Sequence, residues 1–178
     1  MDDNQILELT HKYGAEHREA EIVWFYKVCE NINPEIIVEI GIRRGGTLRV
    51  LSSMLNSEGI VINIDMQDDI VWDQMDYPCN AFRINGSSFD KNIVTKLKKC
   101  LKGKKIDVLF IDGEHSYENV MQDYKIFSNL VRSGGIIAVH DIYYLDEVAR
   151  AWKDIPSEHK YESIWNQSSI GIGYIVKD

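Results

Sequence analysis

The sequence predicts an α/β protein built on a doubly wound, mostly parallel sheet with helices on both faces and a C-terminal antiparallel hairpin. Two patterns predict it: five short apolar runs that alternate with segments of helical spacing, and two further apolar runs joined by a polar turn. The length agrees, since 178 residues, 44% hydrophobic and 27% charged, make one globular domain. We expect residues 1–178 to form that single domain, with residues 1–33 as a helical cap and 34–178 as the core.

The first elements are a helix, a strand, a glycine loop and a second helix. Within residues 16–31, apolar side chains recur at helical spacing, namely Ile22, Phe25, Tyr26 and Cys29. After Pro34, residues 36–40 form a β-branched run typical of a strand buried on both faces. A glycine-bearing turn over residues 41–47 leads back to helical spacing at Leu48, Leu51, Met54 and Leu55.

The same alternation continues along the chain. Four more strands are predicted at residues 60–65, 81–84, 106–111 and 136–139. Residues 66–80 show no clear period and are expected to be a long loop. Helices are expected at residues 93–101, 117–131 and 146–152, with Gly134 and Gly135 stopping the second of them.

The last two apolar runs predict the hairpin. They cover residues 161–165 and 170–176, and a polar turn over residues 166–169 joins them.

Charge and composition exclude several classes of protein. The chain has 20 basic and 28 acidic residues, a net charge of −8, which disfavours nucleic-acid partners. Six lysines between residues 96 and 105 lack interleaved aromatic residues, so we expect a solvated helix end there. The start lacks the pattern of a signal peptide, no run is apolar enough to cross a membrane, and the three cysteines form no C-x-x-C pair. We therefore expect a soluble, cytoplasmic protein with no membrane partner.

Residues suited to chemistry collect where the predicted strands end. Parallel sheets bind ligands beyond the carboxyl ends of their strands. The residues that follow a strand directly or within a few positions are Gly41, Asp65, Gly86, Asp112, His115, His140 and Asp141. This edge of the sheet is the predicted binding site.

The first two strand ends favour a nucleoside-containing cofactor. The loop Gly41-Ile42-Arg43-Arg44-Gly45-Gly46-Thr47 lacks the dinucleotide pattern G-x-G-x-x-G, because Arg43 stands where its second glycine belongs. Asp65, at the end of the second strand, is placed to accept hydrogen bonds from ribose hydroxyls. A tight turn that needs glycines only for its geometry is the alternative for the loop alone.

Three motifs together resemble class I S-adenosylmethionine-dependent methyltransferases, whose sheet is Rossmann-like. They are Glu-x-Gly-x-x-x-Gly from Glu39, an acid at Asp65, and Asp-Gly-x-His from Asp112. The stretch from Ile111 to Tyr117, Asp123, and Gly134-Gly135 through His140-Asp141 is similar to the cephalosporin hydroxylase and macrocin O-methyltransferase group, which includes rhamnosyl O-methyltransferases. The resemblance covers about residues 36–141, plus residues 171–173 near the end.

The resemblance implies a role for each matching residue. Glu39 and Gly41 would border the methionine and ribose parts of the cofactor, and Asp65 would bind the ribose hydroxyls. The remaining implied cofactor contacts are Gly45, Thr47, Gly86, Ser87 and Asp112. Trp72 is a candidate for packing on the adenine ring, although a packing role within the protein is favoured for it.

Asp112, His140 and Asp141 are the predicted metal ligands. They leave two adjacent strands at one edge, and a divalent ion there, Mg²⁺ or Mn²⁺, would position two vicinal sugar hydroxyls. The resembling sugar methyltransferases have two acids where this chain has His140-Asp141. His140 therefore either shifts the preference toward Mn²⁺, Fe²⁺ or Zn²⁺, or serves as a second base, or bonds to the backbone.

His115 is the predicted catalytic base, because histidine takes up protons near neutral pH. Ser116 is available to cap the following helix, so the helix start does not require His115. His11, His17 and His159 lie in segments expected to be polar surface, and they are given no role.

The predicted function is transfer of a methyl group from S-adenosylmethionine to a hydroxyl of a small molecule, with a sugar or glycoside as the expected acceptor. Two alternatives remain: a nicotinamide-dependent oxidoreductase, and a non-catalytic module that binds a cofactor or nucleotide-sugar. Little of the chain is left for a substrate lid, so either the N-terminal residues and the 66–80 loop form it or a homodimer completes it.

Overall fold

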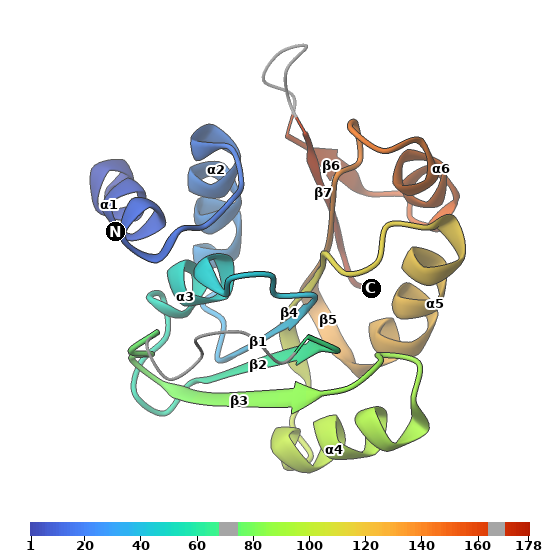
Figure 1. Ribbon diagram of the computed structural model, residues 1–178, viewed down its shortest axis with the longest axis horizontal. Coiled ribbons are helices and arrows are strands. Elements are labelled where there is room, and N and C mark those ends of the chain that lie inside the picture. The colour runs from blue at the N-terminus through green and yellow to red at the C-terminus, as the bar shows by residue number, and fades with distance from the viewer. Residues whose placement is uncertain (68–74, 164–169) are drawn as a thin grey trace.

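In a computed structural model, the protein consists of a single mixed sheet with helices on both of its faces (Figure 1). The structure describes residues 1–67, 75–163 and 170–178. Within these residues the sheet has seven strands in the order β3-β2-β1-β4-β5-β7-β6. The predicted fold class is confirmed, including the antiparallel edge made by the last strands.

Five strands run parallel, and two at the C-terminal edge do not. The parallel strands are β1 (Ile36–Ile40), β2 (Ile60–Asp65), β3 (Asn80–Asn85), β4 (Ile106–Ile111) and β5 (Val131–His140). The antiparallel pair is β6 (Lys160–Glu162) and β7 (Ile172–Val176), with β7 beside β5. From β1 the chain winds outward to β3, then returns to β4 on the other side of β1. The junction of β1 and β4 is therefore the point where strand order reverses, and ligands bind at such points.

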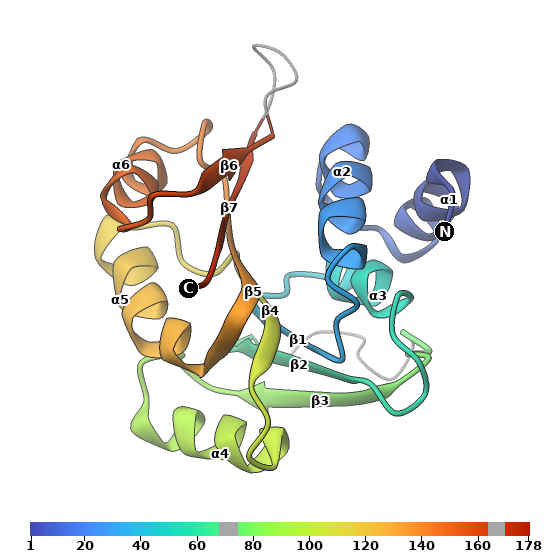
Figure 2. The ribbon, with the colours of Figure 1, turned by 180° about the vertical axis from the view of Figure 1, so that it is seen from behind.

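The helices form two layers that bury alternate residues of the strands. One layer, seen on the other side of the sheet from α4 and α5 in Figures 1 and 2, consists of α1 (Asp3–Tyr13), α2 (Glu19–Glu30) and α3 (Gly46–Ser52). It packs on Ile37, Val61 and Phe110. The other layer packs on Val38, Ile62 and Ile137, and its members are α4 (Lys91–Leu101), α5 (Tyr117–Phe127) and α6 (Asp146–Asp154).

Helix starts follow the expected capping chemistry. The Asp2 carboxylate accepts from the Gln5 N–H while the Gln5 side chain accepts from the Asp2 N–H, so a capping box begins α1. The Ser116 hydroxyl accepts from the Asn119 N–H and caps α5, as predicted. The lysines near the end of α4 are all exposed, in agreement with a solvated helix end.

One predicted boundary is wrong. The helix expected to reach residue 131 ends at Phe127, a 3₁₀ turn covers Ser128–Leu130, and Gly134 and Gly135 lie inside β5 rather than stopping a helix. The β4–β5 register shifts between the pairs Ile106–Val131 and Val108–Ile136, so the glycines occupy an irregular stretch of the strand. There the Gly134 N–H donates to the Lys177 carbonyl, which ties β5 to the C-terminal residues.

Two predictions fall partly on residues that the structure does not describe. Trp72 lies outside the described residues, as does the 166–169 turn of the hairpin. Among the described helices, none is long and apolar enough to span a lipid bilayer.

Candidate functional site

The residues predicted from the strand ends line two adjacent pockets at the β1–β4 junction. The first pocket, of about 560 Å³, is lined by the predicted residues Gly41, Asp65, Gly86, Ser87, Asp112 and His115. The second, of about 320 Å³, is lined by Glu39, Gly45, Thr47, Asp112, His115, His140 and Asp141. Asp112 and His115 border both pockets, so every residue predicted for the site lies in one continuous region.

The ends of β1 and β4 touch at Gly41. The Asp112 N–H donates to the Ile40 carbonyl at 2.9 Å, and Gly41 has a φ of +81°. A Cβ at position 41 would lie 2.1 Å from the Asp112 carbonyl oxygen. Only glycine fits both this backbone conformation and this close approach.

Asp65 is fixed at the wall of the first pocket. Its Oδ2 accepts from the Ile42 N–H and its Oδ1 accepts from the Gln67 N–H, each at 2.7 Å. These bonds connect the end of β2 to the glycine loop after β1. Each carboxylate oxygen keeps a further lone pair for a ligand hydroxyl.

Glu39 is a buried acid without a full set of partners. Its side chain is 2% exposed, and among the described residues Oε2 has no hydrogen-bond partner. Burial, reinforced by the nearby carboxylates of Asp112 and Asp65, raises the pKa of Glu39 well above its usual value. A cationic group placed beside Glu39 would lower that pKa and favour the ionised carboxylate, which would in turn stabilise the cation.

Two histidines and two aspartates form a connected cluster that lines the second pocket. Nδ1 of His140 lies 3.1 Å from Asp112 Oδ1 and 3.5 Å from Asp141 Oδ2. Nε2 of His115 lies 3.1 Å from Asp141 Oδ2 and 3.7 Å from Asp112 Oδ1. Asp141 has a φ of +62°, an uncommon conformation that directs the chain just after β5.

The cluster strongly perturbs the pKa values of its members. Burial alone would raise the pKa of Asp112 and of Asp141, but the His115 and His140 rings beside them hold the pKa of both well below the usual value. The nearby carboxylates of Asp112 and Asp141 raise the pKa of His115 to about 9. For His140, burial opposes the same two carboxylates, which outweigh it and raise its pKa to about 10.

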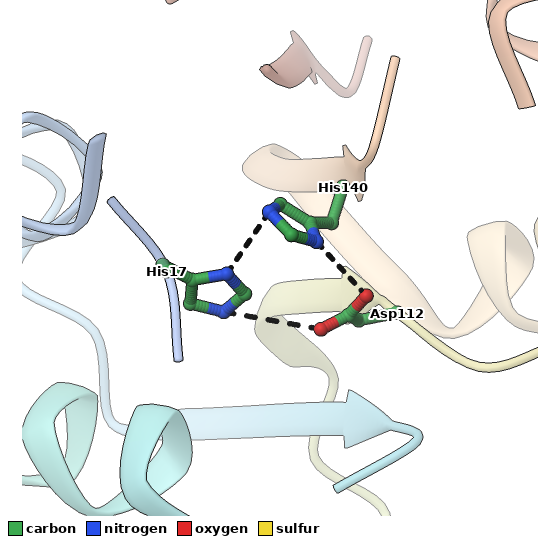
Figure 3. Close-up of side chains that lie close together, drawn as sticks. All are labelled: His17, Asp112 and His140. Atoms are coloured by element: carbon green, nitrogen blue, oxygen red, sulfur yellow. Dashed lines mark hydrogen bonds and ion pairs between the residues drawn. The ribbon is translucent and has the colours of Figure 1, made fainter. Parts of the chain in front are cut away.

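His17 also belongs to this cluster, so the prediction that it lies on the polar surface is wrong. Only 4% of its side chain is exposed, and its Nδ1 lies 3.0 Å from His140 Nε2 (Figure 3). Burial, and then the charge of His140, lowers the pKa of His17 to about 3, so the ring is neutral. His11 and His159 are exposed, as predicted.

A model of the methyltransferase domain family matches residues 38–142, which is more than half of the chain. The matched segment runs from β1 to the residues just after β5 and contains every residue predicted for the site. His17 lies outside the matched segment.

A relative of 34% identity covers part of this chain. Uncharacterized protein R132 of Acanthamoeba polyphaga mimivirus is 34% identical over 116 residues, which is 58% of this chain and 50% of that protein. This chain thus spans about half the length of that relative.

Solved structures show the same fold at low sequence identity. The O-methyltransferase of Bacillus cereus, in complex with SAH, has a TM-score of 0.74 at 15% identity, over 99% of this chain and 92% of that one. TomG of Streptomyces achromogenes, in complex with SAM, has a TM-score of 0.70 at 12% identity, over 99% and 89%. The MycE methyltransferase of the mycinamycin pathway, in complex with Mg, SAH and mycinamycin VI, has 0.69 at 15% identity, over 97% and 54%.

Proposed function

The chain belongs to the methyltransferase domain family, and on that premise we propose that it transfers the methyl group of S-adenosylmethionine to a hydroxyl oxygen of a small molecule. The observation that carries the proposal is the pair of pockets that share Asp112 and His115. One pocket has the size and lining for a nucleoside cofactor, and the other brings acids and imidazoles to its edge.

The residues of the site fit S-adenosylmethionine. Glu39 offers a buried carboxylate oxygen that lacks a partner among the described residues, and the cofactor carries a cationic ammonium group. Gly41 has no Cβ to collide with the Asp112 carbonyl, so the loops after β1 and β4 lie close together at the wall of the first pocket. When bound, the cofactor supplies a methyl group activated by its sulfonium. Asp65 would bind the ribose hydroxyls, and Gly86 and Ser87 would lie near the adenine.

The remaining implied contacts lie at the second pocket. Gly45 adopts a left-handed conformation at the start of α3, and Thr47 is buried in the first turn of that helix. Together they would complete the glycine loop around the methionine part of the cofactor. The N–H groups at the start of α3 suit the negatively polarised atoms of a ligand.

His115 would accept the hydroxyl proton at Nδ1, because its Nε2 faces Asp141 Oδ2 at 3.1 Å, as the new O–C bond forms and the S–C bond breaks. It borders both pockets and its side chain is about half exposed, so it can reach an acceptor placed between them. Asp112 and Asp141 raise its pKa to about 9, so the ring must first lose a proton to serve as a base. A cation that engaged these carboxylates would weaken their hold on the imidazolium.

A divalent metal, Mg²⁺ or Mn²⁺, would be held by Asp112, His140 and Asp141. The donor set fits a cation, since ionised carboxylates and an imidazole converge with nitrogen–oxygen distances of 3.1 and 3.5 Å. When bound, the cation would supply a positive charge that orients vicinal hydroxyls and lowers the pKa of the reacting one.

A sugar or glycoside is the acceptor that we propose. Several hydrogen-bonding groups line the second pocket beside the exposed ring of Tyr144, and a sugar can satisfy many of them at once. The solved complex of MycE with Mg, SAH and mycinamycin VI supports a small-molecule acceptor and a metal.

The test is a methyl-transfer assay with mass spectrometry. The purified chain, S-adenosylmethionine and a panel of glycosides should give a product in which one hydrogen is replaced by methyl. His115→Ala should lose at least about a hundredfold in turnover, the usual contribution of a general base, while binding of S-adenosylhomocysteine stays within about threefold. His159→Ala, an exposed histidine far along the chain, is the matched control.

Equal loss of binding and turnover in His115→Ala would remove His115 from the chemistry. Failure of the wild-type chain to bind S-adenosylhomocysteine would overturn the proposed function.

A further inference from the structure

His17 is brought into the site by the segment that connects α1 to α2. This segment, residues 14–18, lies against the start of α3, where a Cβ on Gly46 would be 2.4 Å from the Ala15 nitrogen. His17 therefore meets His140, the last residue of β5, and Asp112, which follows β4, so three separate parts of the chain converge (Figure 3). The two imidazole rings meet edge to face, with centroids 4.1 Å apart.

A hydrogen-bonded relay from His17 through His140 to Asp112 does not account for this arrangement. The relay uses only Nδ1 of His17, which lies 3.0 Å from His140 Nε2. Nε2 of His17 is buried and, within the described part of the chain, has no hydrogen-bond partner. Its nearest acid atom is Asp112 Oδ2 at 3.8 Å, too far for a hydrogen bond. A buried polar atom without a partner is costly, so Nε2 requires another explanation.

We propose that His17, Asp112 and His140 are the protein ligands of a transition-metal ion, and that this site binds Zn²⁺ far more tightly than Mg²⁺. One ligand atom from each residue lies within 4.8 Å of the other two. Ligand atoms in a tetrahedral centre with bonds of about 2.0–2.1 Å are about 3.3 Å apart. The separations are 3.8 Å from His17 Nε2 to Asp112 Oδ2 and 3.1 Å from His140 Nδ1 to Asp112 Oδ1, on either side of that value. Ligation through these two nitrogens would replace the hydrogen bond between the two rings.

The donor set determines the class of metal. Mg²⁺ takes oxygen ligands and retains its waters, whereas two imidazoles and one carboxylate suit zinc, iron, cobalt or manganese. Asp141 Oδ2, 3.5 Å from His140 Nδ1, is near enough to be a further ligand. Asp112 also belongs to a second group of candidate ligands, together with His115 and Asp141. This second group is more exposed than the first, and it faces the proposed acceptor.

The inference concerns the metal site of the proposed function. What the ion would do in the reaction rests on that function, whereas the binding of the ion does not. It adds a ligand from the N-terminal segment to a site otherwise built by the strand ends. The segment between α1 and α2 would then be tied to the sheet by the ion.

The test is metal binding by the full chain, prepared without a polyhistidine tag and stripped of metal with a chelator. Zn²⁺ is titrated in competition with a chromophoric chelator, and Mg²⁺ is titrated separately. We expect one equivalent of Zn²⁺, with an affinity at least a thousandfold above that for Mg²⁺. His17→Gln should weaken Zn²⁺ binding at least tenfold, and His11→Gln, an exposed histidine on α1, should leave it unchanged.

A wild-type chain that binds no Zn²⁺, or a folded His17→Gln variant with wild-type affinity, would overturn the inference. The wild-type chain loaded with Cu²⁺ provides a test that needs no variant, since its electron paramagnetic resonance spectrum should show coupling to two nitrogens. Coupling to one nitrogen or none would also overturn it. Neither experiment involves a methyl donor or acceptor, so failure here is separate from failure of the methyl-transfer assay.

Discussion

Asp123 is a buried acid at the edge of the first pocket whose ionisation opposes folding. It is 2% exposed, and among the described residues its Oδ1 has no hydrogen-bond partner. Burial raises the pKa of Asp123 from 3.8 to about 6, against a hydrogen bond with Ser88 and with help from the charge of Glu114. The folded protein therefore binds the Asp123 proton more tightly than the unfolded chain does.

Because the folded pKa is the higher one, Asp123 destabilises the protein as the pH rises. Its contribution is most favourable below about pH 4 and is lost as the pH passes through 6, by at most about 3 kcal/mol for a shift of this size. We expect Asp123→Asn to gain stability relative to wild type between pH 4 and 7. Urea unfolding at pH 4.5, 5.5 and 7 measures this.

Glu8→Gln, which changes an exposed acid on α1, is the control for Asp123→Asn. A difference between wild type and Asp123→Asn that stays constant across this range would show that Asp123 titrates normally in the folded protein.

The sequence predicts the positions of some site residues and not of others. Asp112, His115 and Asp141 follow strands, and parallel strands bring their ends to one edge, so a pattern of strands was enough to group them. His17 lies 123 positions from His140 in a connection between helices. Its neighbours Glu16 and Arg18 are charged, which suggests a surface, and no periodicity links such a connection to a strand end.

At the scale of elements, the connection between α1 and α2 is held mainly by packing. Glu16 pairs with Arg43 and Arg44 of the glycine loop, but both arginine side chains are 78% exposed. Exposed ion pairs contribute at most about 1 kcal/mol. In contrast, Gly46 lies against the backbone of Ala15 and Tyr13, with no space for a Cβ.

Two substitutions separate the contribution of the Glu16 ion pairs from that of packing at Gly46. Glu16→Gln should change the free energy of unfolding by less than about 1 kcal/mol. Gly46→Ala should cost about 1–3 kcal/mol or more, because the added methyl group must displace backbone atoms. Denaturant unfolding of both variants at low and high salt provides the measurement. A larger loss in Glu16→Gln, removed by high salt, would show that charge holds the connection in place.

The sequence also predicts some helices and strands more accurately than others. The five parallel strands were found because continuous β-branched runs mark strands buried on both faces. The end of α5 was misplaced because Leu130 and Val131 continue its helical spacing although Val131 already pairs with Ile106 of β4. Local spacing cannot show which partner a residue will have across the sheet.

At the scale of the whole molecule, the order of strands joins the two pockets. From β1 the chain continues to β2 and β3 on one side of β1, and then returns to form β4 on the other side. The glycine loop after β1 and the loop after β4, which begins at Asp112, therefore lie next to each other. A ligand that fills the first pocket would contact the ends of β1, β2, β3 and β4 together. Binding there should stabilise the whole fold, because unfolding would separate all of its contacts at once.

This coupling predicts a thermal shift that is specific to the cofactor. A ligand at a hundred times its dissociation constant stabilises the folded state by about 2.7 kcal/mol, which raises the Tm of a domain of this size by about 5–10 °C. S-adenosylhomocysteine should produce that shift, whereas NAD should not, because Arg43 stands where a pyrophosphate-binding loop needs glycine. A UDP-sugar should not produce it either. A shift with NAD or UDP-sugar alone would instead favour an oxidoreductase or a nucleotide-sugar-binding module built on the same sheet.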